Sequence, residues 1–196
     1  ALDQEGSSVR QFIGDGQRQY LSGMFLGGQR ILVLMDSSAS MLDNTLVNII
    51  RTRNMDDDRK RNAPKWQRVV KTVDWISTQL PVTSRYQVWH FNQEHSSVLE
   101  GTTETWLEVA DRDQLNQVIA GAEQVVPQNG TNLQQVFRAA SSMNPRPDNI
   151  FLITDGLPTL GVRESRDNLI TPNRRMELFE EAVEELPWHS GECNID

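Results

Sequence analysis

The chain has 196 residues, which is long enough for one domain with a single core and too short for two comfortable ones. Its formal net charge of −8 argues against a partner bound through a phosphate backbone, which would require clustered lysine and arginine. No apolar stretch approaches the ~18–20 residues that a membrane-spanning helix needs. Cys193 is the single cysteine, so the chain can form no internal disulfide.

The first predicted elements along the chain are an arm and a buried strand. Residues 1–28 are polar and contain several glycines, and we interpret them as an N-terminal arm before a domain over residues 29–196. Ile31–Met35 is an unbroken run of bulky apolar residues, which predicts a strand buried on both faces of a parallel sheet. Residues 43–62 are polar and charged, and we expect an inserted loop or a pair of short turns.

A helix is predicted directly after the insert, because apolar side chains recur there at three- and four-residue spacing. Pro64 suits its first turn, and Pro81 stops it. The apolar stripe of this helix consists of Trp66, Val69, Val70, Val73, Ile76 and Leu80. We also expect Trp75 to lie on or near the buried face.

Strands and helices alternate through the rest of the chain. The predicted strands are Tyr86–Phe91, an edge hairpin of Ser97–Leu99 with Thr105–Val109, and Ile150–Ile153, which again reads as buried on both faces. The predicted helices are one capped by Asp111, one over roughly Asn132–Met143, and one over about Arg174–Leu186 that would bury Met176, Leu178, Phe179, Ala182, Val183 and Leu186. This alternation predicts an α/β fold with a parallel sheet.

Three polar segments are expected to meet at the carboxyl edge of the sheet, where open α/β proteins bind their ligands. Asp36–Ser40 follows the first buried strand, Gly130–Asn132 opens a helix, and Thr154–Gly156 follows the other long apolar strand. Together they could bring two carboxylates and three hydroxyls to one point. Such an all-oxygen set with few charges suits a hard divalent cation, so we predict a Mg²⁺ site, with Mn²⁺ or Ca²⁺ as substitutes.

These segments, in this order, resemble the von Willebrand factor A (vWA) domain family and its metal-ion-dependent adhesion site (MIDAS). The resemblance covers roughly residues 30–196 and implies a three-layer, Rossmann-like fold with a central, mostly parallel sheet and helices on both faces. It also implies the ligands: hydroxyls from Ser38, Ser40 and Thr131, with Asp36 and Asp155 binding the ion directly or through water. The arm and the insert lie outside the resemblance, and the final strand of the family is expected to be truncated at Cys193–Asp196.

The predicted function is that of a binding module and not of an enzyme. The cation would capture a Glu or Asp side chain of a protein partner, and the insert and Leu157–Thr159 would contribute specificity. One alternative is an intracellular adaptor subunit of an ATP-driven chelatase or remodelling complex. Another is a Mg²⁺-dependent phosphotransferase with Asp36 as nucleophile, although Ser38 stands where a second acid is needed and no lysine is obviously placed to hold a phosphate.

Three further features are given simpler interpretations. His90, His95 and His189 are too scattered to form a zinc-protease motif. The sequon at Asn129–Thr131 would place a glycan over the predicted metal site, so we expect it to be unused. For the location of the protein we expect the cell envelope, either periplasmic or surface-exposed, with the cytoplasm as the alternative.

Overall fold

The computed structural model describes residues 20–21, 24–25, 27–161 and 171–186. Most of the predicted arm lies outside these ranges, as do Cys193–Asp196 and the truncated strand expected there. The described part of the arm includes a short antiparallel pair, β1 (Tyr20–Leu21) and β2 (Met24–Phe25).

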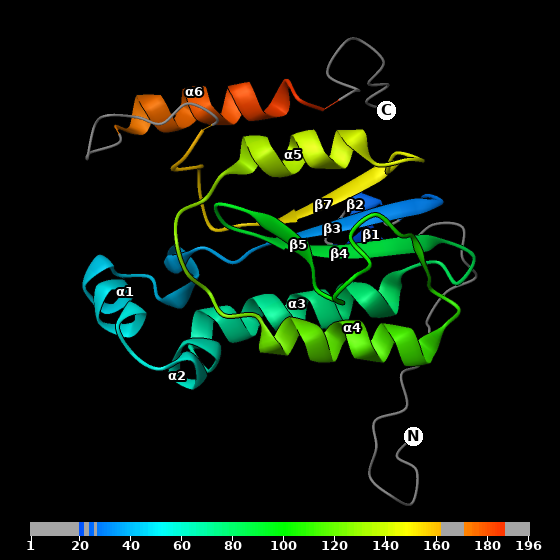
Figure 1. Ribbon diagram of the computed structural model, residues 1–196, viewed down its shortest axis with the longest axis horizontal. Helices are drawn as coiled ribbons and strands as arrows, with labels where there is room; N and C mark the ends of the chain where they lie inside the picture. The colour runs from blue at the N-terminus through cyan, green and yellow to red at the C-terminus, as the bar shows by residue number, and fades with distance from the viewer. Residues whose placement is uncertain (1–19, 22–23, 26, 162–170, 187–196) are drawn as a thin grey trace, which may run out of the picture.

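The centre of the molecule is a sheet whose three longest strands are parallel (Figure 1). The middle strand, β3 (Arg30–Asp36), lies between β4 (Arg85–Phe91) and β7 (Asn149–Ile153) and pairs in parallel with both. Its register places Asp36 opposite Phe91 and Met35 opposite Ile153, so the three strands end at one level. The polar residues that follow the strands therefore start from a common edge.

The central strand confirms the prediction of burial on both faces, because Ile31 to Asp36 are all buried. The same prediction for β7 is wrong, because each of its residues is only half-buried. Among the described strands β7 pairs with β3 alone, so it lies at an edge of the sheet. An unbroken apolar run indicates that a strand tends to be buried, but it does not indicate how many strands flank it.

The two short strands are β5 (His95–Ser97) and β6 (Leu107–Glu108). Both pair with β4 in antiparallel orientation, β5 near its carboxyl end and β6 near its amino end. The predicted hairpin between them is therefore wrong, although the prediction of short strands at this edge of the sheet is confirmed. The two segments pair with the same strand, β4, and do not pair with each other. Residues 98–106 connect them along the length of β4.

Helices cover both faces of the sheet (Figure 1). On one face, α3 (Pro64–Gln79) and α4 (Arg112–Gln124) pack on Ile31, Val33 and Met35 of β3. On the other face, α5 (Leu133–Ser142) and α6 (Pro172–Val183) pack on a cluster that contains Leu32 and Leu34. Alternate residues of one strand thus enter two separate cores. The predicted three-layer, Rossmann-like α/β fold with a mostly parallel sheet is confirmed.

The insert is helical, which corrects the prediction of a loop or turns. It forms α1 (Leu46–Arg53) and α2 (Asp57–Arg61), after a short 3₁₀ helix, η1 (Ala39–Leu42). The side chain of Thr45 accepts a hydrogen bond from the backbone of α1, and that of Asp56 accepts one from α2. These N-caps satisfy free backbone N–H groups at the start of each helix. The charge-rich composition of the insert did not by itself indicate helices.

Two expected core residues are exposed. The side chain of Trp75 on α3 is 42% exposed, and that of Met176 on α6 is 47% exposed. With 3.6 residues per turn, Trp75 falls on the face of α3 opposite its buried residues, and Met176 falls well away from Leu178 and Ala182, the buried residues of α6. None of the helices in the described ranges combines the length and the hydropathy that crossing a membrane requires.

Candidate metal centre

The carboxylate of Asp36 is held rigidly at the end of β3. It is 1% exposed, and its Oδ1 accepts a hydrogen bond from the backbone N–H of Ser38 at 2.8 Å. Its Oδ2 accepts a hydrogen bond from Thr154 Oγ1, also at 2.8 Å. The segment after β3 is tied to the end of β4 by a bond from Ser37 N–H to the carbonyl of Phe91 (2.8 Å). The turn therefore presents a fixed carboxylate at the sheet edge.

A chain of hydroxyls leads from this turn to the second carboxylate. Ser40 Oγ donates a hydrogen bond to Asp155 Oδ1 at 3.0 Å, and Ser38 Oγ lies 2.8 Å from Ser40 Oγ. A serine hydroxyl has one proton, and that of Ser40 is given to Asp155, so Ser38 is the donor between the two serines. Four of the five predicted ligands are thus brought together: Asp36, Ser38, Ser40 and Asp155.

Thr131, the fifth predicted ligand, follows a loop that is hydrogen-bonded to the serine turn. The backbone of Gln128 donates to the carbonyl of Ser37 (2.8 Å), and the backbone of Ala39 donates to the carbonyl of Asn129 (2.9 Å). Thr131 itself is buried, and its backbone N–H donates to Thr159 Oγ1 at 2.9 Å. The hydrogen bonds of Thr131 to its neighbours run through its backbone, and none joins its hydroxyl to the two aspartates.

A lysine also lies in the centre, contrary to the prediction. Lys65, in the first turn of α3, forms an ion pair with Asp155 Oδ2. Its ammonium also donates to the carbonyl of Ser40 at 2.9 Å and to the carbonyl of Asp43 at 3.3 Å. A positive charge is therefore already present beside one of the two carboxylates.

The negative charge of Asp36 is only partly stabilised by its surroundings. Burial raises the pKa of its carboxyl above the usual value, and the negative charge of Asp155 raises it further. The hydrogen bonds from Ser38 and Thr154 act in the opposite direction but do not cancel the effect of burial. A cation near both carboxylates would stabilise the ionised form of Asp36.

The donor set fits a hard cation. Carboxylate and hydroxyl oxygens are the ligands that Mg²⁺ and Ca²⁺ prefer. The described ranges contain no cluster of three or more His, Cys, Asp and Glu residues with a metal-binding arrangement. A site here would depend on serine and threonine hydroxyls and on water, which suits Mg²⁺ because this ion commonly retains several waters.

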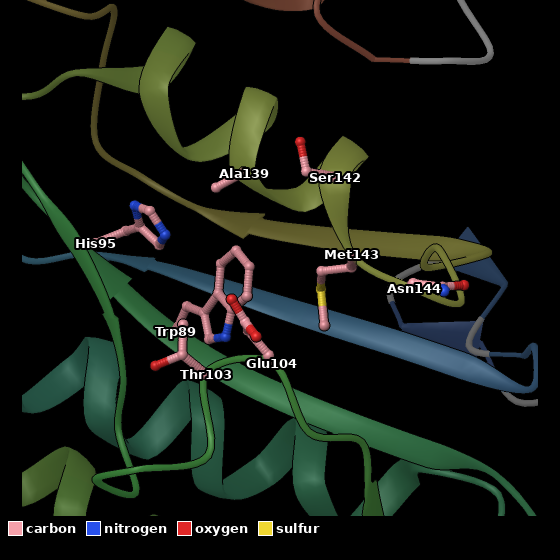
Figure 2. A pocket seen from close by; sticks show the side chains of 8 residues that line it. All are labelled: Trp89, His95, Thr103, Glu104, Ala139, Ser142, Met143 and Asn144. Carbon is pink, nitrogen blue, oxygen red and sulfur yellow. The ribbon is translucent and has the colours of Figure 1, made fainter.

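A separate hollow of about 320 Å³ lies under α5, away from the residues of the metal centre. Figure 2 shows the eight side chains that line it, from β4, β5, α5 and the loops next to them: Trp89, His95, Thr103, Glu104, Ala139, Ser142, Met143 and Asn144. The rings of Trp89 and His95 lie 5.1 Å apart, and neither Trp89 Nε1 nor His95 Nδ1 has a hydrogen-bond partner in the part of the chain that the structure describes. None of its lining residues belongs to the metal centre.

Comparison with known proteins gives distant structural likenesses only. No family model matches the chain, and no curated protein matches it. One similar structure is that of proximal thread matrix protein 1 from the mussel byssus, with 17% identity and a TM-score of 0.40 over 81% of this chain and 36% of that one. A second structure of this protein, with a zinc-occupied MIDAS motif, has 16% identity and a TM-score of 0.41 over 79% of this chain and 36% of that one. The chain thus spans little more than a third of these proteins, and at such TM-scores we base no argument on the likeness.

Two residues of this centre, Thr154 and Lys65, were not among the predicted ligands. Thr154 belongs to a segment already singled out, and its position next to Asp155 at a strand end was the available signal. Lys65 has no local signal, because the whole insert separates it from Ser40 in the sequence. Only the packing of α3 against η1 brings its ammonium to the sheet edge.

Proposed function

We propose that this chain is a vWA-type binding module that holds a divalent cation and uses it to capture a carboxylate of a protein partner. Its cation ligands would be Asp36, Ser38, Ser40, Thr131 and Asp155. The observation that carries the proposal is the chain of hydrogen bonds that joins the two carboxylates: the backbone N–H of Ser38 binds Asp36, and the hydroxyls of Ser38 and Ser40 lead on to Asp155. The expected ion is Mg²⁺, with Mn²⁺ or Ca²⁺ as substitutes.

The composition of the site favours capture of an external acid. Of the five proposed ligands, two are negatively charged, Asp36 and Asp155, and Lys65 already offsets one of these charges. A divalent cation held mainly by neutral hydroxyls and water keeps much of its charge. It would therefore attract a further carboxylate, and a Glu or Asp side chain is the form in which a protein supplies one.

The insert adds an apolar surface beside this centre. On α1 the side chains of Leu46, Val47 and Ile50 are 71%, 76% and 48% exposed, and none of the residues of α1 is buried. This helix follows η1, which itself begins at the serine turn. A partner that presents an acidic residue next to apolar side chains would contact the cation and this helix together, which supports a protein as the ligand.

A phosphotransferase remains the second candidate, because Lys65 is placed at the site after all. Two observations weigh against it. Asp36 is 1% exposed, which leaves little room for a bulky phosphoryl group to approach its carboxylate, whereas a small ion needs less space. The ammonium of Lys65 already has three acceptors, which leaves it no proton for a phosphate oxygen.

Metal binding is tested by calorimetric titration of Mg²⁺ and Mn²⁺ into protein treated with a chelator. We expect one saturable site that is lost in Asp36→Asn. Glu123→Gln is the matched control, since it removes the same charge from an exposed position on α4 and should bind normally. Equal binding by Asp36→Asn and the control would contradict the assignment of the centre.

Capture of a carboxylate is tested by selecting peptides from a displayed random library in Mn²⁺ and eluting with a chelator. We expect enriched peptides to contain Asp or Glu and to lose binding when that residue becomes Asn or Gln. Selection of peptides without a required acid would count against the proposal. Turnover of a generic phosphoester, abolished in Asp36→Asn, would favour the phosphotransferase.

The cellular setting belongs to the same proposal. An adaptor subunit of a chelatase or remodelling complex would use the same centre inside the cell. An envelope location would favour the binding module, and a cytoplasmic location would favour the adaptor subunit. Fractionation of cells that express the protein decides between them.

A further inference from the structure

We propose that Lys65 is a built-in competitor of the divalent cation, and that its ammonium sets the affinity of the centre by holding Asp155 when no metal is bound. The inference rests on the proposed function, because it concerns how the same centre is regulated. It makes Asp155 a shared ligand that is bound either by the tethered ammonium or by the ion.

The geometry around the ammonium of Lys65 supports this role. Lys65 Nζ contacts Asp155 Oδ2, the carbonyl of Ser40 at 2.9 Å and the carbonyl of Asp43 at 3.3 Å. An ammonium has three protons, so all of them have acceptors. The two side chains of the ion pair are only 19% and 21% exposed, unlike those of a solvated surface pair. The lysine is therefore held in a specific place.

The position of Lys65 on its helix also supports this role. It is the second residue of α3, and no acidic residue lies in that first turn. The amino end of a helix carries partial positive charge, so a lysine there opposes the helix dipole. Helix stability thus favours another residue at this position. The contact with Asp155 explains why a cation is tolerated there.

The charges around Asp155 make the ammonium and a divalent cation compete. Lys65 binds Oδ2 of Asp155, while Oδ1 accepts the hydroxyl of Ser40, so both oxygens of this carboxylate are in use. A divalent cation at the same oxygens would lie beside the ammonium and would be repelled by it. Binding of the ion therefore requires the ammonium to move away from Asp155 or to remain at an electrostatic cost. In either case Lys65 lowers the affinity for metal.

The test compares Lys65→Met with Lys71→Met, which removes the same charge from an exposed position on the same helix. We expect Lys65→Met to bind Mn²⁺ at least tenfold more tightly than the wild type in calorimetric titration. Lys71→Met should bind like the wild type, and so should Lys65→Arg, which keeps the charge. Unchanged or weaker binding by Lys65→Met would overturn the inference.

A second measurement needs no metal. Without its ammonium, Asp155 keeps its charge near Asp36, so thermal unfolding in chelator should begin at a lower temperature for Lys65→Met than for Lys71→Met. Added Mn²⁺ should raise the unfolding temperature of Lys65→Met more than that of the wild type. Equal unfolding temperatures for the two variants in chelator would contradict the role of Lys65.

The outcomes separate the inference from the proposed function. If the wild type binds Mn²⁺ and Lys65→Met binds it equally, the inference fails and the metal centre stands. If neither protein binds, the proposed function fails and the inference fails with it. Binding by Lys65→Met alone would support both.

Discussion

The hydroxyl of Thr154 at the end of β7 donates a 2.8 Å hydrogen bond to Oδ2 of Asp36 at the end of β3. The bond joins neighbouring parallel strands at the sheet edge and fixes one oxygen of a buried carboxylate. Residues that orient a metal ligand in this way commonly change metal affinity by 10–100-fold when removed.

Thr154→Val should therefore weaken Mn²⁺ binding by about tenfold, because it keeps the shape of the side chain and removes the donor. Thr154→Ser keeps the hydroxyl and should bind close to normally. Calorimetric titration of the two variants gives the comparison. Equal affinities would show that Asp36 is held sufficiently by Ser38 alone.

Gln87 is a buried polar residue in β4 whose amide ties the connection between β5 and β6 to the sheet. It is fully buried, and its Nε2 donates to the carbonyls of Thr102 (2.6 Å) and Thr105 (2.7 Å). Gln87→Leu leaves both carbonyls without this donor and should lower the free energy of unfolding by about 2–4 kcal/mol. Urea denaturation measures this change in the free energy of unfolding. The exposed Gln117→Leu on α4 is the control and should change stability by less than about 0.5 kcal/mol.

Gly121 on α4 is a site where the usual preference for alanine in helices should be reversed. Alanine is favoured over glycine by about 1 kcal/mol in a helix interior. A Cβ at this position would meet the backbone carbonyl oxygen of Val98 at 2.8 Å and Val98 Cγ1 at 3.0 Å. We expect Gly121→Ala to destabilise the protein by about 1–3 kcal/mol. The exposed Asn116→Ala on the same helix should instead be neutral or stabilising, and the same result for Gly121→Ala would show that Val98 moves aside freely.

Two histidines near the sheet edge should make stability depend on pH. Burial lowers the pKa of His90, and the charge of His95 lowers it further; burial also lowers the pKa of His95, against the opposing charge of Glu94. Below a pH of about 6.5 the unfolded chain binds protons that the folded histidines do not, so acidification favours unfolding.

The stabilising effect of the neutral histidines should thus be present above this pH and lost as the pH falls toward their folded pKa values. Urea midpoints at pH 7.5 and 5 should differ less in a His90→Gln/His95→Gln variant than in the wild type. Comparing the two proteins cancels the opposite contribution of Asp36, whose raised pKa favours folding at low pH. Identical pH dependence in both proteins would exclude the histidines as its source.

The central strand and the polar residues at its end could be predicted from the sequence, because both depend on a short local stretch of the chain. Ile31–Met35 has no polar face, which favours burial on both sides, and the serine turn directly follows it. The helices α3, α4 and α5 also followed from apolar spacing with a proline or a capping residue at the start. These are local properties of the chain.

The errors arose where the outcome depends on distant parts of the chain. The half-buried state of β7 depends on how many strands flank it, and the pairing of β5 and β6 depends on the position of β4. The place of Lys65 depends on how α3 docks near η1, across an insert of unpredicted structure. The ligand roles of the five metal-centre residues stay predictions until binding is measured.

The insert has a consequence for how this protein could change its partners. None of the residues of α1 or α2 is buried, so neither helix contributes a buried side chain to the core. The segment is nevertheless continuous with the serine turn through η1. In the proposed function the insert contributes to recognition without adding a buried side chain to the core. Exchanging α1 alone for another amphipathic helix should therefore redirect specificity with little change in the unfolding temperature of the scaffold.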